Sequence, residues 1–400
     1  MLPVRRPPPA GTAAEKLLTR GLGPRTTMVL LSLVLLFIYL EFSPPLLLTA
    51  MIYGYEGELL ELDLTKTLVS PANTLPFAPT VCKRVVKHAF KHAHERMPKL
   101  GEVAVAKMDG IKMAIYGKHT DIVSDAIRES GDWEANTWEI LQSAMEEVER
   151  QEGERPTFVD IGAHIGWFSF RAIKAGYRVF SFEAMPTNLA ALLETHCLNG
   201  PARLHRHTHA VYAVAASNGK KDCKLVSHSS NVGDGILECD ENWKPADGYQ
   251  AMPRMGMNTI DNLIKDELFN PSRLSVVKMD VSGHEMFVME GAHDWLASNR
   301  RPKVVFSEIW KLSGTTSKYI RLMIEHGYEV YVREKDDGNG FEKLTENMAM
   351  EFAKAWETGK ALDHANPTTD VIFAQPAYVP LLATGHFRPR YVGPSAAVGA

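Results

Sequence analysis

Asp160 and Glu183 are the two side chains of this sequence that are best placed for ligand chemistry. Each ends a short apolar run, and Gly162 and Gly166 lie between them. This order predicts a β-α-β unit in which both strands end in a carboxylate, at the edge where open parallel sheets bind ligands. Gly162 has no Cβ, so the backbone there can turn sharply and approach a ligand. Glu183 stands where such folds place the acid that binds the hydroxyls of an adenosine ribose.

Two nucleoside cofactors fit this arrangement. A dinucleotide requires a G-x-G-x-x-G turn, so that its pyrophosphate rests on a helix N-terminus. Here His164 stands where the second glycine of that turn is required. S-adenosylmethionine has no phosphate, and nearby carboxylates attract its sulfonium and amino groups. We therefore expect S-adenosylmethionine rather than NAD as the cofactor. The alternative is that the glycine turn binds no ligand and only packs a helix on a sheet.

Five motifs resemble those of FkbM-type methyltransferases, in the same order. The first reads V-D-I-G-A-H-I-G followed by F-E-A-M-P, where the family pattern is roughly V-D-x-G-A-N-x-G and F-E-P-x-P. The others are SSNVGDG at 229–235, NTIDNL at 258–263, VVKMDVSGHE at 276–285 and VVFSEI at 304–309. The segment 121–134 also resembles the part that leads into the family's domain. The resemblance implies a Rossmann-like class I methyltransferase that uses S-adenosylmethionine.

Methyl transfer to a hydroxyl requires an aligned acceptor and a base that removes its proton. Asp280 ends an apolar run and His284 follows in a turn opened by Gly283, so either is a candidate base. Glu308 ends the next apolar run and is expected to support the base or contact the acceptor. Each has a structural alternative, which is a helix cap for Asp280, a backbone hydrogen bond for His284 and an ion pair for Glu308.

The resemblance assigns a further set of residues to the cofactor. The turn after the first strand is expected to line its methionine part and Glu183 its ribose, while the loop around Asn231 closes over it. The cofactor set is Asp160, Gly162, His164, Gly166, Glu183, Asn188 and Asn231. No metal site is expected.

Ser282 is a departure from the family pattern, because the usual D-V-E-G-x-E has a carboxylate at its position. If that carboxylate is essential, the chain is instead a membrane-tethered module that binds S-adenosylmethionine at a degenerate site. His164, in place of the usual Asn, is a milder change, since both side chains form hydrogen bonds.

Alternating strands and helices must position these residues. Strands are expected near 158–161, 178–182, 209–214, 275–281, 304–309, 329–333 and 371–375, and helices near 165–175, 187–199, 318–326 and 348–358. This alternation predicts an α/β fold with a mostly parallel, doubly wound sheet over residues 157–376. The span 217–257 is expected to be a long irregular loop that acts as a lid. His196 is expected to be a helix-face residue rather than a catalyst.

Residues 101–156 are expected to form an N-terminal cap on this domain. Two strands flank an Asp109-Gly110 turn, which indicates a hairpin, and a helix follows over 134–149. Trp133 and Glu134 are expected either to contact the cofactor or substrate, or to form a packed loop.

The N-terminal part indicates a membrane anchor. A disordered tail (1–26) rich in Pro, Gly and Arg precedes an apolar segment (27–52), and a proline-broken stem (53–100) follows. Cations before the apolar segment and acids after it predict a single-pass type II protein with a lumenal catalytic domain in the Golgi or ER. A cleaved signal peptide and other targeting stay as alternatives. Lumenal placement favours a glycan or another small hydroxyl compound as acceptor.

The overall composition restricts the remaining partners. The net charge is −4 and no basic patch indicates a nucleic-acid partner. The four cysteines contain no C-x-x-C pair, which argues against a zinc site, and their spacing does not determine a disulfide. His88, His92 and His94 are expected on a solvated helix. A second tail is expected at 377–400, and nothing indicates an oligomeric state.

Overall fold

The computed structural model describes residues 70–71 and, with short gaps, residues 104–378. Contacts divide the chain into a unit of residues 1–62 and a unit of residues 63–400, and every described residue belongs to the second. The predicted tail, anchor, histidine cluster and almost all of the stem therefore lie outside the described residues. Within the described part, no helix combines the length and apolar character needed to cross a bilayer.

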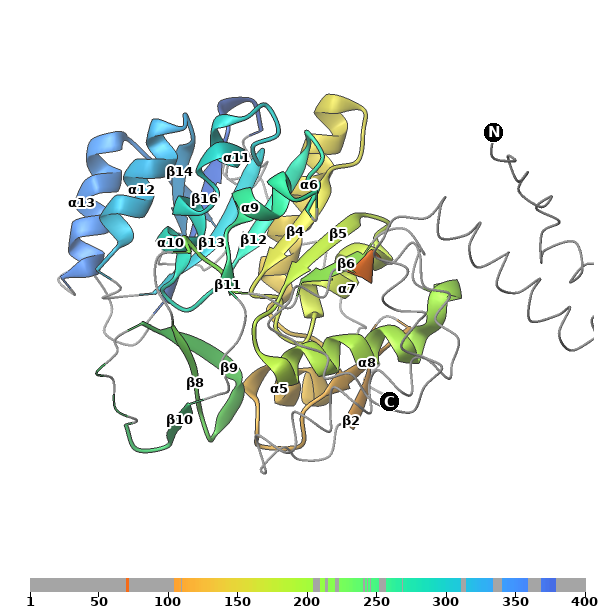
Figure 1. Ribbon diagram of the computed structural model, residues 1–400. Helices are drawn as coiled ribbons and strands as arrows, with labels where there is room; N and C mark the ends of the chain where they lie inside the picture. The colour runs from red at the N-terminus through yellow and green to blue at the C-terminus, as the bar shows by residue number, and fades with distance from the viewer. Residues whose placement is uncertain are drawn as a thin grey trace, which may run out of the picture. The chain divides into compact units, whose positions relative to one another are not determined.

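A nine-stranded mixed sheet forms the centre of the described chain (Figure 1). Its strands, in spatial order, are β1 (Ser70–Pro71), β6 (His209–Tyr212), β5 (Arg178–Phe182), β4 (Thr157–Ile161), β12 (Ser275–Met279), β13 (Val304–Trp310), β16 (Thr368–Ala374), β14 (Glu329–Arg333) and β15 (Phe341–Leu344). The five strands from β6 to β13 pair in parallel. Because β16 is antiparallel to both β13 and β14, β14 runs with these five. The prediction of a mostly parallel sheet is confirmed, with antiparallel strands β1, β16 and β15 added.

Helices cover both faces of this sheet, as predicted for a doubly wound fold. One face carries α6 (Ala135–Glu152), α7 (Trp167–Lys174) and α8 (Pro186–Arg203). The other carries α9 (Ile260–Lys265), α10 (Glu285–Glu290), α11 (His293–Ala297), α12 (Thr316–Glu325) and α13 (Glu346–Glu357). Residues of β4 alternate between the two cores, with Phe158 in the first and Val159 and Ile161 in the second. That alternation follows from the two-residue period of a strand.

The N-terminal part contains the predicted hairpin of β2 (Ala104–Met108) and β3 (Ile111–Ile115), followed by α5 (Ile122–Ser130) and α6. Polar side chains of α8 bind the free edge of β3, since Thr195 Oγ1 accepts from the Ala114 N–H at 2.8 Å. The Asp121 side chain caps the N-terminus of α5, and Gly131 ends it in the left-handed conformation. A short 3-10 turn (Pro376–Tyr378) follows β16, so ordered chain extends slightly past the predicted domain end.

The span 217–257 is not the irregular loop that was predicted. It contains the antiparallel strands β8 (Lys224–His228), β9 (Asn231–Glu238) and β10 (Tyr249–Ala251), which lie at the lower left of Figure 1. A Cys223–Cys239 disulfide joins the residues just outside β8 and β9. A parallel pair, β7 (Ala215–Ala216) with β11 (Met257–Asn258), closes this insertion at its base. The prediction was wrong because Gly and Asn were counted as loop residues, whereas β9 has one Asn and two Gly inside a strand.

Candidate active site

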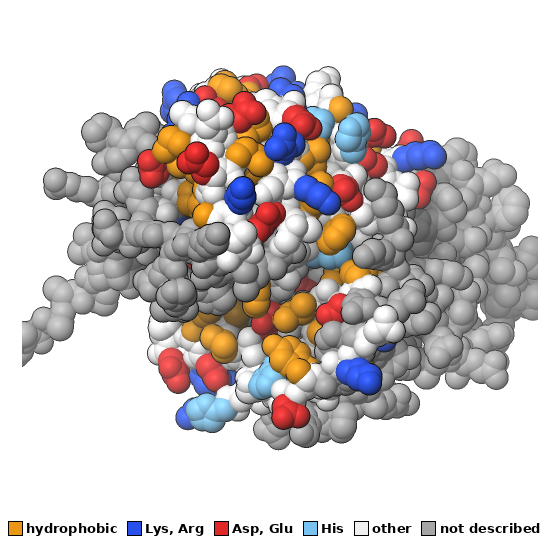
Figure 2. Space-filling view, turned by 90° about the vertical axis from the view of Figure 1, so that its left-hand side faces the viewer, with side chains coloured by type: hydrophobic (Ala, Val, Ile, Leu, Met, Phe, Trp, Pro, Cys, Tyr) orange, Lys and Arg blue, Asp and Glu red, His pale blue; other side chains and the backbone are white. Residues whose placement is uncertain are grey.

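A cavity of about 250 Å³ lies at the carboxyl ends of the central strands. It is lined by residues that end or follow β4, β5, β12 and β13, by β9, and by the segments at 121–123 and 133–134. Its position agrees with the rule that open α/β sheets bind ligands beyond the carboxyl ends of their strands. Figure 2 shows the side of the molecule that bears α13 and β10, where hydrophobic and acidic side chains lie next to one another in its lower half.

The turn after β4 requires glycine at Gly162. Its φ is +81°, and a Cβ at this position would overlap the backbone carbonyl of Asp280. Both the Gly162 and the Ala163 N–H groups donate to the Phe182 carbonyl at 3.0 Å. The ends of β4, β5 and β12 are therefore held close together at this turn, and the predicted need for close backbone approach is explained by the protein's own backbone.

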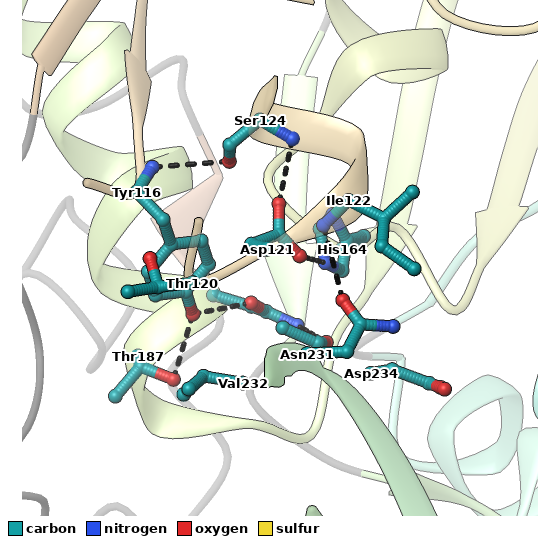
Figure 3. A network of polar contacts seen from close by, with 12 residues as sticks. Tyr116, Thr120, Asp121, Ile122, Ser124, His164, Thr187, Asn231, Val232 and Asp234 are labelled. Carbon is teal, nitrogen blue, oxygen red and sulfur yellow. Dashed lines mark hydrogen bonds and ion pairs between the residues drawn. The ribbon is translucent and has the colours of Figure 1, made fainter. Parts of the chain in front are cut away.

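Three side chains beside this turn, Asp121, His164 and Glu183, form what we call the turn cluster. The His164 N–H donates to Glu183 Oε2 at 2.6 Å, and the Met185 N–H donates to Glu183 Oε1 at 2.7 Å. His164 Nε2 lies 3.1 Å from Asp121 Oδ2 (Figure 3). Burial raises the pKa of Glu183 despite these donors and the nearby imidazole. The cluster thus presents a fixed carboxylate at the end of β5, where the sequence predicted it.

Asn188 and Asn231 join the cavity wall to neighbouring elements. Asn188 accepts from the Tyr116 hydroxyl at 2.6 Å and donates to the Gly233 carbonyl at 2.8 Å. Asn231 Oδ1 accepts from the Ile122 N–H at 3.1 Å. Both line the cavity as predicted, and in the described structure their amides connect β9 to the domain.

A second group, which we call the carboxylate cluster, consists of Glu134, Asp280 and Glu308 around Lys278. Lys278 Nζ lies 3.1 Å from Asp280 Oδ2 and 5.1 Å from the centre of the Phe168 ring. Burial would lower the pKa of Lys278, but Asp280, Asp160 and Glu134 raise it above its usual value. Lys278 is therefore a fixed cation that holds the Asp280 carboxylate in the cavity wall.

The other two acids of this cluster hold protons more tightly than a free glutamate. Burial, with Asp280, Asp370 and Glu134 adding to it, raises the pKa of Glu308 to about 9. Burial raises the pKa of Glu134 to about 6, with Lys278 opposing it. At neutral pH the Glu308 carboxyl is consequently protonated and able to donate a hydrogen bond.

The predicted residues Asp160, Gly166 and His284 do not line this cavity. Asp160 is fully buried and accepts from Ser169 Oγ at 2.5 Å behind the strand end. Gly166 lies at the start of α7 against the ring of Phe170. His284 precedes α10, with Nε2 3.3 Å from Ser217 Oγ and its ring against Phe287. The remaining predicted residues, Gly162, His164, Glu183, Asn188, Asn231, Asp280 and Glu308, lie together.

His196, predicted to lie on a helix face, is in α8 with its ring against Phe170. Burial lowers its pKa to about 4, which keeps the imidazole neutral.

Ser282, the departure from the family pattern, lies next to a carboxylate supplied by another strand. Its hydroxyl donates to Asp234 Oδ1 at 3.4 Å, and both residues line the cavity. Burial raises the pKa of Asp234, and Asp280 adds to the rise. The loss of a carboxylate at position 282 is therefore accompanied by a carboxylate from β9.

Several lining residues were not assigned to the site from the sequence, above all Asp121, Asp234 and Lys278. Lys278 lies two residues before Asp280, so the alternation of a strand would have placed both on one face. Asp234 lies inside the SSNVGDG motif. Asp121 begins the segment 121–134 that resembles the entry part of the family's domain, but that resemblance gives no indication of its contact with His164.

The match to a family model decides the class of the site. Residues 160–330 match the model described as the methyltransferase FkbM domain. This part of the chain is an FkbM methyltransferase domain. The family resemblance is thereby confirmed over these residues, and the match supports a methyltransferase activity. The search of curated proteins finds no match for the chain.

Solved structures that resemble the chain include methyltransferases of low sequence identity. A SAM-dependent methyltransferase from Agrobacterium tumefaciens is 13% identical, with a TM-score of 0.34 over 70% of this chain and 73% of the other. WbdD in complex with a kinase inhibitor is 8% identical, with a TM-score of 0.34 over 64% of this chain. The match spans only 45% of the WbdD chain, which is less than half its length.

Proposed function

We propose that this protein is an S-adenosylmethionine-dependent methyltransferase that methylates a hydroxyl of a glycan or another small molecule. One observation carries the proposal: the cavity of the FkbM domain has Glu183 at the end of β5 and Asp280 at the end of β12, on either side of the Gly162 turn. The first carboxylate suits a nucleoside ribose, and the second suits removal of a proton from an acceptor.

The residues at the turn fit S-adenosylmethionine better than a dinucleotide. Asp121 and Glu183 are both close to His164, and two carboxylates repel a pyrophosphate while they attract a sulfonium and an amino group. His164 Nδ1 is buried and has no hydrogen-bond partner within the described chain, so a donor remains for the carboxylate of the methionine part when the imidazole is protonated. When bound, S-adenosylmethionine supplies a methyl group activated by its sulfonium.

Of the two candidate bases, Asp280 is the one that lines the cavity, and His284 does not. Lys278 fixes the Asp280 carboxylate, which takes the proton of the acceptor hydroxyl as that oxygen attacks. The protonated Glu308 carboxyl donates a hydrogen bond to an acceptor oxygen and helps to orient it. Trp133 and Trp310, next to these acids, present apolar surface that excludes water.

We further propose that residues 27–52 anchor the protein as a single-pass type II membrane protein of the Golgi or ER. The Cys223–Cys239 disulfide supports a lumenal catalytic domain, because such bonds persist in oxidising compartments and are rare in the cytosol. A lumenal location in turn favours a glycan as acceptor.

The competing function, a binding module with a degenerate site, rests on Ser282. The nearby Asp234 and the complete carboxylate cluster favour the enzyme, since the cavity does not lack acids.

The test uses the full chain with methyl-labelled S-adenosylmethionine and glycan extracts. We expect label on a glycan fraction and its loss when extract is omitted. Cofactor binding without label transfer to any fraction would instead support the binding module, and absence of cofactor binding would overturn both.

A further inference from the structure

The contact between Asp121 and His164 joins two segments that are distant in sequence. Asp121 is only 1% exposed, and its Oδ2 lies 3.1 Å from His164 Nε2. Its other oxygen accepts from the Ser124 N–H at 2.7 Å and thereby caps α5 (Figure 3). One carboxylate therefore fixes both the N-terminus of α5 and the imidazole at the cofactor turn.

His164 has a backbone conformation that is uncommon for a residue with a side chain. Its φ is +53°, which lies in the left-handed region. Such a conformation costs about 1–2 kcal/mol and persists only where the surroundings hold it. Here the Asp121 carboxylate contacts the His164 imidazole, and Glu183 Oε2 accepts a hydrogen bond from the His164 backbone N–H. Both the side chain and the backbone of His164 are therefore held in place. A change at Asp121 is therefore transmitted to the donor that orients Glu183.

The charges around this contact favour an ion pair. Burial would lower the pKa of the His164 imidazole, but Asp121, Glu183 and Asp234 raise it above its usual value. Burial would raise the pKa of Asp121, but His164 and the hydrogen bond from Ser124 bring it below its usual value. Removing one partner of a buried pair leaves the other charge uncompensated, which is more costly than replacing both.

Strand β9 packs directly against the pair. A Cβ at Gly233 would overlap both Asp121 Oδ2 and His164 Nε2, so the backbone of β9 lies directly against the contact. The Val232 N–H donates to the Thr120 carbonyl at 2.8 Å, one residue before Asp121. Figure 3 shows these segments converging on the two side chains. The backbone of β9 thus covers the contact on this side, while part of the His164 side chain stays open to the cavity.

We propose that Asp121 is a positioning residue of the cofactor site. It fixes the imidazole of His164, and the backbone N–H of His164 in turn orients the ribose-binding carboxylate of Glu183. The proposal rests on the proposed function, because it assumes that Glu183 binds S-adenosylmethionine. It also explains the His at position 164 where the family usually has Asn: imidazolium and Asp121 form an ion pair that an Asn cannot form.

The first test compares Asp121→Asn with the wild-type full chain. Asn is as good a helix cap as Asp, so α5 keeps its N-terminus while the ion pair is lost. We expect the Kd for S-adenosylmethionine, measured by calorimetry, to rise at least tenfold, since a hydrogen bond to a charged group contributes about 1.5–3 kcal/mol. The matched control is Asp125→Asn on the same helix, where the acid pairs with Arg128 away from the cavity and no change is expected.

A double-mutant cycle separates positioning from general destabilisation. His164→Asn alone should weaken cofactor binding, and the Asp121→Asn/His164→Asn double variant should bind more tightly than additive losses predict, because no buried charge is left unpaired. Strictly additive losses, or an Asp121→Asn variant with wild-type affinity, would overturn the proposal.

A readout that needs no cofactor keeps this proposal distinct from the proposed function. In protein with labelled histidines, the NMR-measured pKa of the His164 imidazole should fall on Asp121→Asn and stay unchanged on Asp125→Asn. The same substitution should alter the His164 amide resonance, which reports the hydrogen bond to Glu183. If wild type binds no S-adenosylmethionine but these signals respond, the coupling stands and the proposed function fails; if they do not respond, the coupling fails.

Discussion

The turn cluster and the carboxylate cluster line the same cavity and hold acidic side chains in opposite ways. In the turn cluster both oxygens of Glu183 accept backbone N–H groups, and Asp121 faces an imidazole. In the carboxylate cluster Glu134, Asp280 and Glu308 share one cation, Lys278. The first arrangement fixes geometry, whereas the second leaves protons that can be exchanged near neutral pH.

Two such clusters allow one cavity to serve both binding and chemistry. A ligand that must be held in one orientation requires acceptors whose own positions are fixed by partners. A hydroxyl that must lose its proton requires a base, and beside Asp280 burial raises the pKa values of Glu134 and Glu308, so that these acids hold protons more tightly. Substitutions in each cluster can show whether ligand binding and proton transfer separate in this way.

The largest effect is expected for Asp280→Asn in the carboxylate cluster. Loss of a general base lowers kcat by roughly 10²–10⁴-fold, because the acceptor hydroxyl keeps its proton. The Kd for S-adenosylmethionine should change far less, since the turn cluster is intact. Steady-state rates with the acceptor found by label transfer, and calorimetry, measure the two quantities. An exposed acid, Asp294→Asn on α11, is the control, and an unchanged kcat in Asp280→Asn would remove Asp280 as the base.

A smaller effect, on both clusters at once, is expected for Gly162→Ala. The new Cβ would overlap the Asp280 carbonyl and the positive φ would be strained, for a combined loss of about 3 kcal/mol in the free energy of unfolding. Gly131→Ala is the control, because its φ is +76° but nothing lies within 4 Å of the added atom. Thermal unfolding of both variants separates overlap from strain; equal destabilisation of the two would refute the close approach at Gly162.

The most gradual effect, spread over several pH units, is a pH dependence that arises from Glu308. Its pKa is raised to about 9 in the folded protein, mainly by burial and then by Asp280, Asp370 and Glu134. The unfolded chain has a normal pKa of about 4.3, so it binds fewer protons between these values and stability falls as pH rises. Glu308→Gln removes this loss. Its stability relative to wild type should therefore increase by about 1 kcal/mol per pH unit between about pH 5 and pH 9.

Chemical denaturation of wild type and Glu308→Gln at several pH values measures this trend. Glu342→Gln, at an exposed position of β15, should follow the wild-type curve. A constant difference between Glu308→Gln and wild type across this range would show that Glu308 is not held protonated.

Much of the fold could be predicted because its signals are local. The apolar runs that become β4, β5, β12 and β13, and the periodic helix α8, were expected within a few residues of their observed bounds. The insertion at 217–257 was not, because β9 contains two glycines and an aspartate that normally indicate a loop, and its pairing with β8 is enforced by the flanking disulfide.

The site was predictable where a residue ends a strand and less so where contacts come from elsewhere. Glu183 and Asp280 were expected at this cavity because they follow β5 and β12, whose ends converge on one edge. Glu308 also lines the cavity, but it lies inside β13 rather than at its end. Asp160 also ends an apolar run, but its buried carboxylate accepts a hydrogen bond from Ser169 of α7 and does not line the cavity. Asp121 was missed because its partner His164 lies 43 residues away in sequence, and such pairing is a property of the tertiary fold.

Calorimetric titration of the full chain with S-adenosylmethionine and with NAD, repeated on Glu183→Gln, tests the central claim most directly. We expect that wild type binds S-adenosylmethionine and not NAD, and that Glu183→Gln weakens this binding about tenfold or more while its unfolding temperature stays close to that of wild type. Preference for NAD, binding of neither compound, or full affinity in Glu183→Gln would contradict it.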